Sequence, residues 1–165
     1  MSPRYYSEEE VKSLYEDAQA YLVQRWEPRP GYKAPILTHG EGVYFWDASG
    51  KRYLDLMSQL YNVHIGLNNR DVIEAAKKQL DELAYSSPSY FNVPQIQLAK
   101  RLAQITPGDL CKTFFANSGT EANEVAIKLA QLYRGASKIV SYWDAYHGST
   151  YAMVSVGGSA RNRQY

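Results

Sequence analysis

The chain has 165 residues, and its 18 lysines and arginines against 17 aspartates and glutamates give a formal net charge of +1. This near-neutral charge lacks the basic excess that nucleic-acid phosphates require, and no apolar run reaches the roughly 18 residues that span a bilayer. The single cysteine, Cys111, excludes an intramolecular disulfide, and the polar N-terminus has no signal-peptide core. We therefore expect a cytoplasmic, globular protein that binds neither nucleic acid nor membrane.

The N-terminal third predicts a helix followed by a small β-meander. Ser7 and Glu10 have the spacing of a capping box, and apolar residues then recur at helical spacing, which favours a helix over about residues 8–25. We expect the proline-rich stretch 27–31 to end it. The meander is expected within residues 35–57, with strand candidates at 36–38, 43–46 and 52–56 and turns at 41–42 and 48–51.

Two more helices are expected in the middle of the chain. The apolar residues Val72, Ile73, Ala76, Leu80 and Leu83 define the face of the first one, with Asn69 or Asp71 as its cap. An irregular aromatic segment, residues 85–93, separates it from the second helix, which begins at Pro94 and closes at Pro107.

The last third is typical of a strand–helix–strand unit. We expect strands at residues 112–116 and 138–142, joined by a helix over residues 121–133. Such a unit implies a parallel sheet with a right-handed crossover, and two core strands cannot complete one. The pattern therefore indicates an α/β fold of which the chain carries the beginning.

The segment 117–123, Asn-Ser-Gly-Thr-Glu-Ala-Asn, lies where the first of these strands leads into the helix. Backbone N–H groups in the first turn of a helix have no partner within it, and Gly119 allows close approach, so a phosphate would fit there. The alternative is an ordinary helix cap, because the same residue types are favoured at any helix N-terminus.

A second candidate loop follows the next strand. Tyr146 offers a ring that could stack on a flat cofactor, and His147 can donate or accept a hydrogen bond beside it. Taken alone, a Tyr-His pair is more often simple packing with one satisfied hydrogen bond. The combination of a phosphate cradle with a stacking ring on a neighbouring strand end is less common.

These two motifs, Asn117–Asn123 and Tyr146-His147-Gly148-Ser149-Thr150, together resemble the class III aminotransferases, which use pyridoxal phosphate (PLP) and have fold type I. Upstream, residues 47–55 look like the N-terminal hairpin of that family. The segment His64-Ile65-Gly66 looks like a degenerate form of its entry motif into the large domain. The resemblance implies that residues 1–65 belong to the small domain, and that residues 66–165 begin a truncated PLP-binding large domain.

The family's site residues can be carried over position by position. The resemblance implies that Gly119 and Thr120 hold the cofactor phosphate through their backbone N–H groups, with the Thr120 hydroxyl added, and that Ser118 shapes the turn. It places Tyr146 on the pyridine ring and His147 against the cofactor. Tyr61 falls where amine:pyruvate members line the substrate pocket, and Tyr90 and Phe91 fall where dimers reach toward the partner's site; core packing is the alternative for these three.

The resemblance implies transfer of an amino group from a primary amine or ω-amino acid to pyruvate or another 2-oxo acid, in a homodimer. The lysine that forms the Schiff base lies further toward the C-terminus in this family, so no catalytic residue is assigned within this chain. No metal ligand is assigned either. The chain alone is expected to be inactive and to self-associate. The alternatives are a non-catalytic fragment or binding module, or an aminomutase or decarboxylase of the same family.

Overall fold

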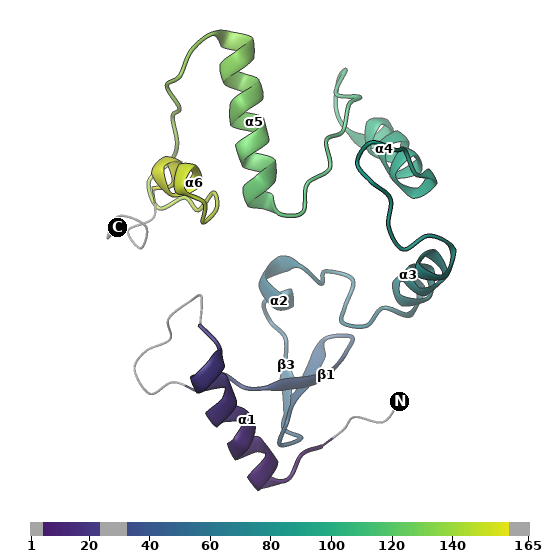
Figure 1. Ribbon diagram of the computed structural model, residues 1–165, viewed down its shortest axis with the longest axis vertical. Helices are drawn as coiled ribbons and strands as arrows, with labels where there is room; N and C mark the ends of the chain where they lie inside the picture. Colours follow the sequence, from purple (N-terminus) through teal and green to yellow (C-terminus); the bar gives the residue numbers. More distant parts are fainter. Residues whose placement is uncertain (1–4, 24–32, 159–165) are drawn as a thin grey trace. The chain divides into compact units, whose positions relative to one another are not determined.

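Two groups of contacts divide the chain, one in Met1–Ser86 and the other in Ser87–Tyr165. The computed structural model describes residues 5–23 and 33–158 (Figure 1). None of the helices in these two ranges is long and apolar enough to cross a membrane. The domain boundary predicted between residues 65 and 66 stays a prediction.

The first helix of the first unit, α1, spans Glu8–Tyr21. The predicted capping box is confirmed, because Ser7 Oγ accepts from the Glu10 amide and the Glu10 carboxylate accepts from the Ser7 amide. The predicted C-terminal end is wrong, since Leu22 is extended with φ −109° and ψ 130°. Val23 is 95% exposed, so tertiary packing does not stabilise a helical conformation at this residue. The proline-rich stretch 27–31 lies outside the described residues.

The predicted meander is confirmed as a three-stranded antiparallel sheet of order β1-β2-β3. Its strands are β1 (Leu37–Glu41), β2 (Tyr44–Asp47) and β3 (Arg52–Leu54). Gly42 makes the first turn with φ +56°, a conformation that glycine adopts without steric cost. Its backbone also exchanges two hydrogen bonds with Leu67, of 3.0 and 2.8 Å, which ties residues 62–69 to the sheet.

The second turn of the meander is organised by the Asp47 carboxylate. One of its oxygens accepts from the backbone N–H groups of Ser49 and Lys51, each at 3.0 Å, and from the Ser49 hydroxyl at 2.6 Å. The other accepts from the Tyr53 hydroxyl at 2.8 Å. Burial raises the pKa of the Asp47 carboxyl, but these hydrogen bonds lower it by more, so the pKa lies below its usual value.

A left-handed turn follows the sheet and was not predicted. This element, α2 (Ser58–Tyr61), has φ values of 46°, 47°, 58° and 66° at four consecutive residues, none of which is glycine. Each non-glycine residue in this region costs about 1–2 kcal/mol, because its Cβ crowds the following carbonyl oxygen. The surroundings must therefore hold the turn in place.

The two predicted middle helices are confirmed as α3 (Arg70–Glu82) in the first unit and α4 (Val93–Ile105) in the second. Of the two cap candidates for α3, Asn69 fills the position, and its side-chain oxygen accepts from the Val72 amide at 3.3 Å. The cap of α4 is Asn92, which accepts from the Gln95 amide at 3.0 Å.

The second unit continues with α5 (Gly119–Arg134) and α6 (Tyr151–Val156). The helix predicted at 121–133 is thus confirmed, and Gly135 ends it with φ +61°. The segments 112–116 and 138–142 do not form strands in the structure. A strand needs a hydrogen-bonded neighbour, and among the described residues the only parallel pairing is an isolated bridge between Trp143 and Gly158.

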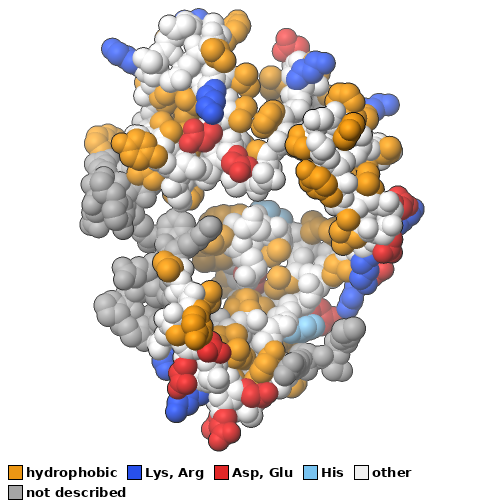
Figure 2. Space-filling model, in the orientation of Figure 1, with side chains coloured by type: hydrophobic (Ala, Val, Ile, Leu, Met, Phe, Trp, Pro, Cys, Tyr) orange, Lys and Arg blue, Asp and Glu red, His pale blue; other side chains and the backbone are white. Residues whose placement is uncertain are grey.

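Little apolar surface is buried within either unit. Among the described residues, Ala48 and Met153 are the only buried hydrophobic side chains. Figure 2 shows hydrophobic side chains spread over the surface of the helices. The most exposed ones in the second unit include Phe91, Tyr133 and Val140, at 90%, 88% and 97%.

Candidate functional site

The candidate phosphate cradle is the first turn of α5. Ser118 is its N-cap, and its hydroxyl accepts from the Glu121 amide at 3.2 Å. The Glu121 carboxylate in turn accepts from the Asn117 amide at 2.7 Å. The Ser118 side chain thus fixes the shape of the turn and serves as an ordinary cap at the same time.

Two backbone donors of this turn are left for a ligand. Within the described residues, no acceptor is found for the N–H groups of Gly119 and Thr120. A Cβ built on Gly119 would meet nothing within 4 Å, so the space in front of the backbone is open. Unpaired donors at the positive end of a helix dipole fit an anionic group such as a phosphate.

The loop that carries Tyr146 and His147 is attached to this same end of α5. Asn123 donates from Nδ2 to the His147 carbonyl oxygen at 2.8 Å. The Thr150 hydroxyl donates to Glu124 Oε1 at 2.5 Å. The two motifs that the sequence set about 25 residues apart therefore lie side by side in the second unit.

Gly148 lets the loop come so close. It is buried, has φ +144°, and a Cβ at this position would lie 2.6 Å from Oγ1 of Thr120. Its role in the structure is to admit the Thr120 side chain, which links the phosphate cradle directly to the loop.

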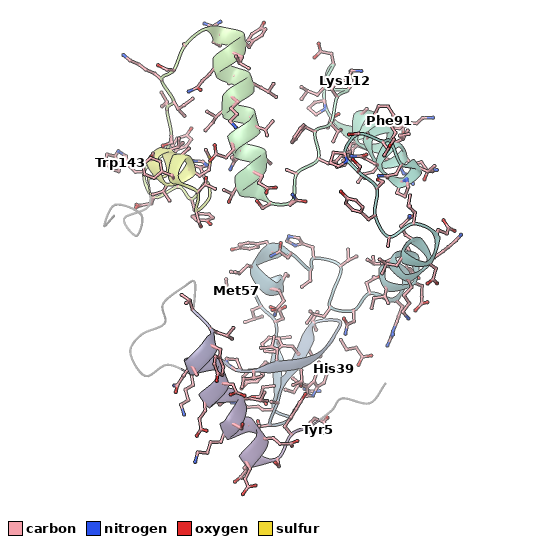
Figure 3. The ribbon with its side chains drawn as sticks, viewed as in Figure 1. Tyr5, His39, Met57, Phe91, Lys112 and Trp143 are labelled. Carbon is pink, nitrogen blue, oxygen red and sulfur yellow. The ribbon has the colours of Figure 1, made fainter. Side chains whose placement is uncertain are left out.

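Tyr146 keeps an exposed ring beside this junction. Its side chain is 52% exposed, and its hydroxyl lies 2.8 Å from the Ser149 hydroxyl, which fixes the far end of the ring. His147 is half-buried. Figure 3 shows Trp143, which precedes this loop, beside α6. A half-exposed tyrosine ring, on a loop that contacts a turn with unpaired N–H donors, suits a flat molecule that carries a phosphate.

Three further aromatic candidates are exposed. Tyr61 ends the left-handed turn in the first unit with 71% exposure, and its ring stacks on His64 at 6.3 Å between centroids. Tyr90 and Phe91, in the second unit, are 70% and 90% exposed. Packing in a core of the described residues therefore does not account for any of the three.

The nine lysines of the chain are all exposed. Three of them form ion pairs on helix surfaces: Lys12 with Glu16, Lys77 with Glu74 and Lys78 with Glu82. Lys33 and Lys51 instead lie over tyrosine rings, 5.4 and 4.9 Å from the centroids.

Sequence reasoning missed the side chains that join the two motifs. Asn123 belonged to the first motif and Thr150 to the second, but neither was given a role, and Glu124 was not considered. Asn123 and Glu124 lie just after the first turn of α5, near the end that carries the cradle. Their short distance from the Ser118 cap in the sequence was the signal that could have identified them. Their partners in a distant loop become visible only in three dimensions.

Known proteins match this chain over most of its length. The family model "Aminotransferase class-III" matches residues 29–164. An acetylornithine aminotransferase from Archaeoglobus fulgidus is 41% identical over 73% of this chain and 32% of its own length. An isoleucine 2-epimerase from Lentilactobacillus buchneri is 37% identical over 81% of this chain and 30% of its own.

The solved structures give the same result. A taurine:2-oxoglutarate aminotransferase from Bifidobacterium kashiwanohense, in complex with PLP and glutamate, superposes with a TM-score of 0.86 at 34% identity. It covers 98% of this chain, which in turn spans 35% of the solved one. The chain thus spans about a third of the length of the proteins it matches.

Proposed function

The chain belongs to the class III aminotransferases, and we propose that it is the N-terminal part of a PLP-dependent enzyme that transfers an amino group from a primary amine or ω-amino acid to pyruvate or another 2-oxo acid. The observation that carries the proposal is the pair of unpaired N–H groups at Gly119 and Thr120, together with the exposed Tyr146 ring on the loop that contacts this turn. The PLP-bound relative supports the choice of cofactor.

In this proposal the first turn of α5 binds the cofactor phosphate. The amides of Gly119 and Thr120 donate to phosphate oxygens, and the helix dipole adds about 0.3–1 kcal/mol, or ~2 kcal/mol where the site is partly buried. Ser118 acts indirectly by fixing the turn. The Thr120 hydroxyl is a third donor, on a side chain that lies against the backbone of Gly148.

Tyr146 and His147 complete the cofactor site. The Tyr146 ring stacks on the pyridine ring, which contributes roughly 0.5–1.5 kcal/mol beyond buried area. The Asn123 bond to the His147 carbonyl oxygen fixes the backbone from which both side chains extend. In this proposal these residues bind and orient the cofactor.

PLP, when bound, supplies an electron sink that stabilises negative charge on the carbon next to the amino group. The lysine that anchors it and the carboxylate that faces its ring nitrogen belong, in this proposal, to the part of the fold that follows residue 165. The chain alone therefore binds the cofactor without catalysis.

We extend the proposal to the substrate and the assembly. Tyr61 lines the pocket for the amine, as in amine:pyruvate enzymes, and its exposure leaves the ring available. Tyr90 and Phe91 reach the neighbouring subunit of a homodimer, which matches their exposure in the single chain. The enzyme acts in the cytoplasm.

The test is a PLP titration of the 165-residue chain, followed by tryptophan fluorescence, with borohydride reduction and mass analysis. We expect saturable quenching, competition by inorganic phosphate, and no reduced adduct on any lysine. Tyr146→Ala should weaken PLP by about three- to tenfold because the stacked ring is lost. Tyr133→Ala, an 88% exposed tyrosine on the same helix as the cradle, is the matched control and should bind PLP normally.

Equal weakening by Tyr146→Ala and Tyr133→Ala would overturn the stacking role. An adduct on one lysine would overturn the assignment of the anchoring lysine to the remainder of the fold. Absence of both quenching and phosphate competition would overturn the cofactor site itself, and would favour a non-catalytic module.

A second candidate function is epimerisation of an amino acid, which the isoleucine 2-epimerase relative favours. An epimerase removes and returns one α-proton and consumes no oxo acid, whereas an aminotransferase needs an acceptor. Incubation of the full-length enzyme with L-isoleucine in deuterated water, without an oxo acid, separates the two. Turnover to the 2-epimer with one deuteron incorporated would identify an epimerase.

A further inference from the structure

The left-handed turn α2 has a conformation that its own residues do not favour. Ser58, Gln59, Leu60 and Tyr61 are all left-handed, and none of them is glycine, asparagine or aspartate, the residues that visit this region most readily. Strained backbone of this kind persists only when neighbouring groups hold it, and it concentrates at functional sites.

Asp55 holds the start of the turn. Its carboxylate accepts from the Met57 amide at 3.2 Å, from the Gln59 amide at 3.1 Å, and from Gln59 Nε2 at 3.1 Å. The Asp55 amide donates to the Val43 carbonyl oxygen at 2.8 Å, so the carboxylate is attached to the sheet. Figure 3 shows Met57 where the chain enters the turn.

Asn62 holds the end of the turn. Its Nδ2 donates to the carbonyl oxygens of Gln59, at 2.9 Å, and Leu60, at 3.2 Å. Its backbone amide donates to the Ser58 carbonyl oxygen at 2.8 Å. The four residues are therefore held by one polar side chain on each side, one accepting and one donating.

The position of Tyr61 follows from this arrangement. Tyr61 is the last left-handed residue, and its amide donates to the Met57 carbonyl oxygen at 2.9 Å, so the direction of its side chain depends on the whole turn. A right-handed backbone at these four residues would point the ring elsewhere. Leu60 and Tyr61 are both well exposed, and the Tyr61 ring also stacks on His64, which lies three residues further along the same segment. The hydrogen bonds of the turn fix the backbone from which this ring extends.

We propose that Asp55 is a positioning residue for the amine substrate: it locks the left-handed turn Ser58–Tyr61 and thereby fixes Tyr61 at the substrate pocket. The inference rests on the proposed function, because it takes the role of Tyr61 from there. Asp55 touches neither substrate nor cofactor in this account, and it acts through the turn.

Asp47 provides a matched control within the same unit. Its carboxylate also accepts several hydrogen bonds from a turn next to the sheet. For both Asp47 and Asp55, burial raises the pKa of the carboxyl, and the hydrogen bonds lower it by more. The turn it organises contains no candidate site residue. Asp47→Asn should therefore destabilise the protein without affecting recognition of the amine.

The first measurement follows the turn directly, by hydrogen exchange of the Gln59, Tyr61 and Asn62 amides in the full-length protein. We expect Asp55→Asn to accelerate these amides about tenfold, because the amide group that replaces one carboxylate oxygen cannot accept from Gln59. Asp47→Asn should leave them unchanged. Unchanged protection in Asp55→Asn would overturn the claim that Asp55 holds the turn.

The second measurement is a double-mutant cycle on kcat/KM for the amine. We expect Asp55→Asn to lower kcat/KM about tenfold in the wild-type background and to have almost no effect in Tyr61→Ala, since it acts through that ring. Asp47→Asn should be additive with Tyr61→Ala. An equal loss from Asp55→Asn in both backgrounds would overturn the proposal.

The two measurements separate failure of this inference from failure of the proposed function. If the full-length protein binds no PLP and transfers no amino group, the role of Tyr61 falls with the proposed function. The exchange rates of the three amides still decide whether Asp55 holds the turn. If the enzyme transaminates normally and the cycle shows additivity, only the inference about Asp55 is wrong.

Discussion

At the scale of single residues, Asp47 shows how one carboxylate can specify a turn. Its two oxygens accept from Ser49, Lys51 and Tyr53, and they bring both sides of the second hairpin together. Hydrogen bonds to the ionised form favour that form, so folding and ionisation of this carboxyl stabilise each other.

This coupling predicts how stability depends on pH. Because the pKa of Asp47 is lowered in the folded state, its contribution is complete above the unfolded pKa of about 3.9 and is lost as pH falls through the lower folded value. Thermal unfolding of the full-length protein should show wild type above Asp47→Asn by a constant margin from pH 7 to about pH 5. The two curves should converge below about pH 4.

Asp17→Asn, which alters an exposed carboxylate on α1, is the control and should follow wild type across the range. A margin between wild type and Asp47→Asn that stayed the same down to the lowest pH would contradict the coupling. It would mean that the substitution acts through shape alone, without a part played by ionisation.

At the scale of elements, the helices were largely predictable because their signals are local. Ser7, Asn92 and Ser118 each cap a helix from a position immediately before it, and Gly135 ends α5 in the left-handed conformation that glycine favours. The cradle position at Ser118, Gly119 and Thr120 followed from the same local rules. In each case, three or four neighbouring residues determine where the helix begins or ends.

Three other features could not be predicted from local sequence patterns. One depends on hydrogen bonds with polar side chains, which hydrophobic spacing does not reveal, and two depend on residues that are distant in the sequence. The turn α2 contains no glycine, the residue that would have indicated a left-handed backbone in the sequence. Hydrogen bonds with Asp55 and Asn62 hold this turn. The segments 112–116 and 138–142 have strand-like composition, but pairing depends on neighbours and not on composition. The approach of Gly148 to Thr120 likewise joins residues that no local pattern connects.

The contact between the loop and the first turns of α5 predicts a coupling between the two motifs. Thr150 and Glu124 share a hydrogen bond of 2.5 Å that holds the loop near α6 against α5. Thr150→Val and Glu124→Gln should each weaken PLP binding by the full-length enzyme severalfold, and the double variant should be little worse than either one. PLP dissociation constants from equilibrium titration measure this.

A matched pair checks the specificity of that coupling. Thr106→Val removes a hydroxyl that bonds to the carbonyl oxygens of Leu102 and Leu110 at the end of α4, and it makes no contact with Glu124. Combined with Glu124→Gln, it should be additive. If the effects of Thr150→Val and Glu124→Gln on the PLP dissociation constant were also additive, the hydrogen bond between Thr150 and Glu124 would not contribute to PLP binding.

At the scale of the whole molecule, the chain exposes much more apolar surface than a stable monomer does. Tyr142, Val140 and Tyr133 are each more than four-fifths exposed, and buried hydrophobic residues are few in the described part. Exposed apolar patches of this kind drive association. The surface matches a chain that spans about a third of the length of its relatives.

We therefore expect the 165-residue chain alone to self-associate and to bind a hydrophobic dye strongly. Size-exclusion chromatography with light scattering should show species larger than a monomer, growing with protein concentration. Val140→Lys, at a 97% exposed position, should reduce association, whereas Lys138→Arg, two residues away, should not. A clean monomer at all concentrations, with weak dye binding, would contradict this expectation.

The left-handed turn also limits which amino acids can replace Tyr61 when this protein is redesigned. At φ +66°, position 61 disfavours valine, isoleucine and threonine, because a branched Cβ crowds the backbone, whatever pocket volume those side chains would suit. Glycine and asparagine are the substitutions that the backbone itself accepts most easily. In a randomised library at this position, we expect backbone strain to lower the stability of the β-branched members, independently of how they fit a substrate.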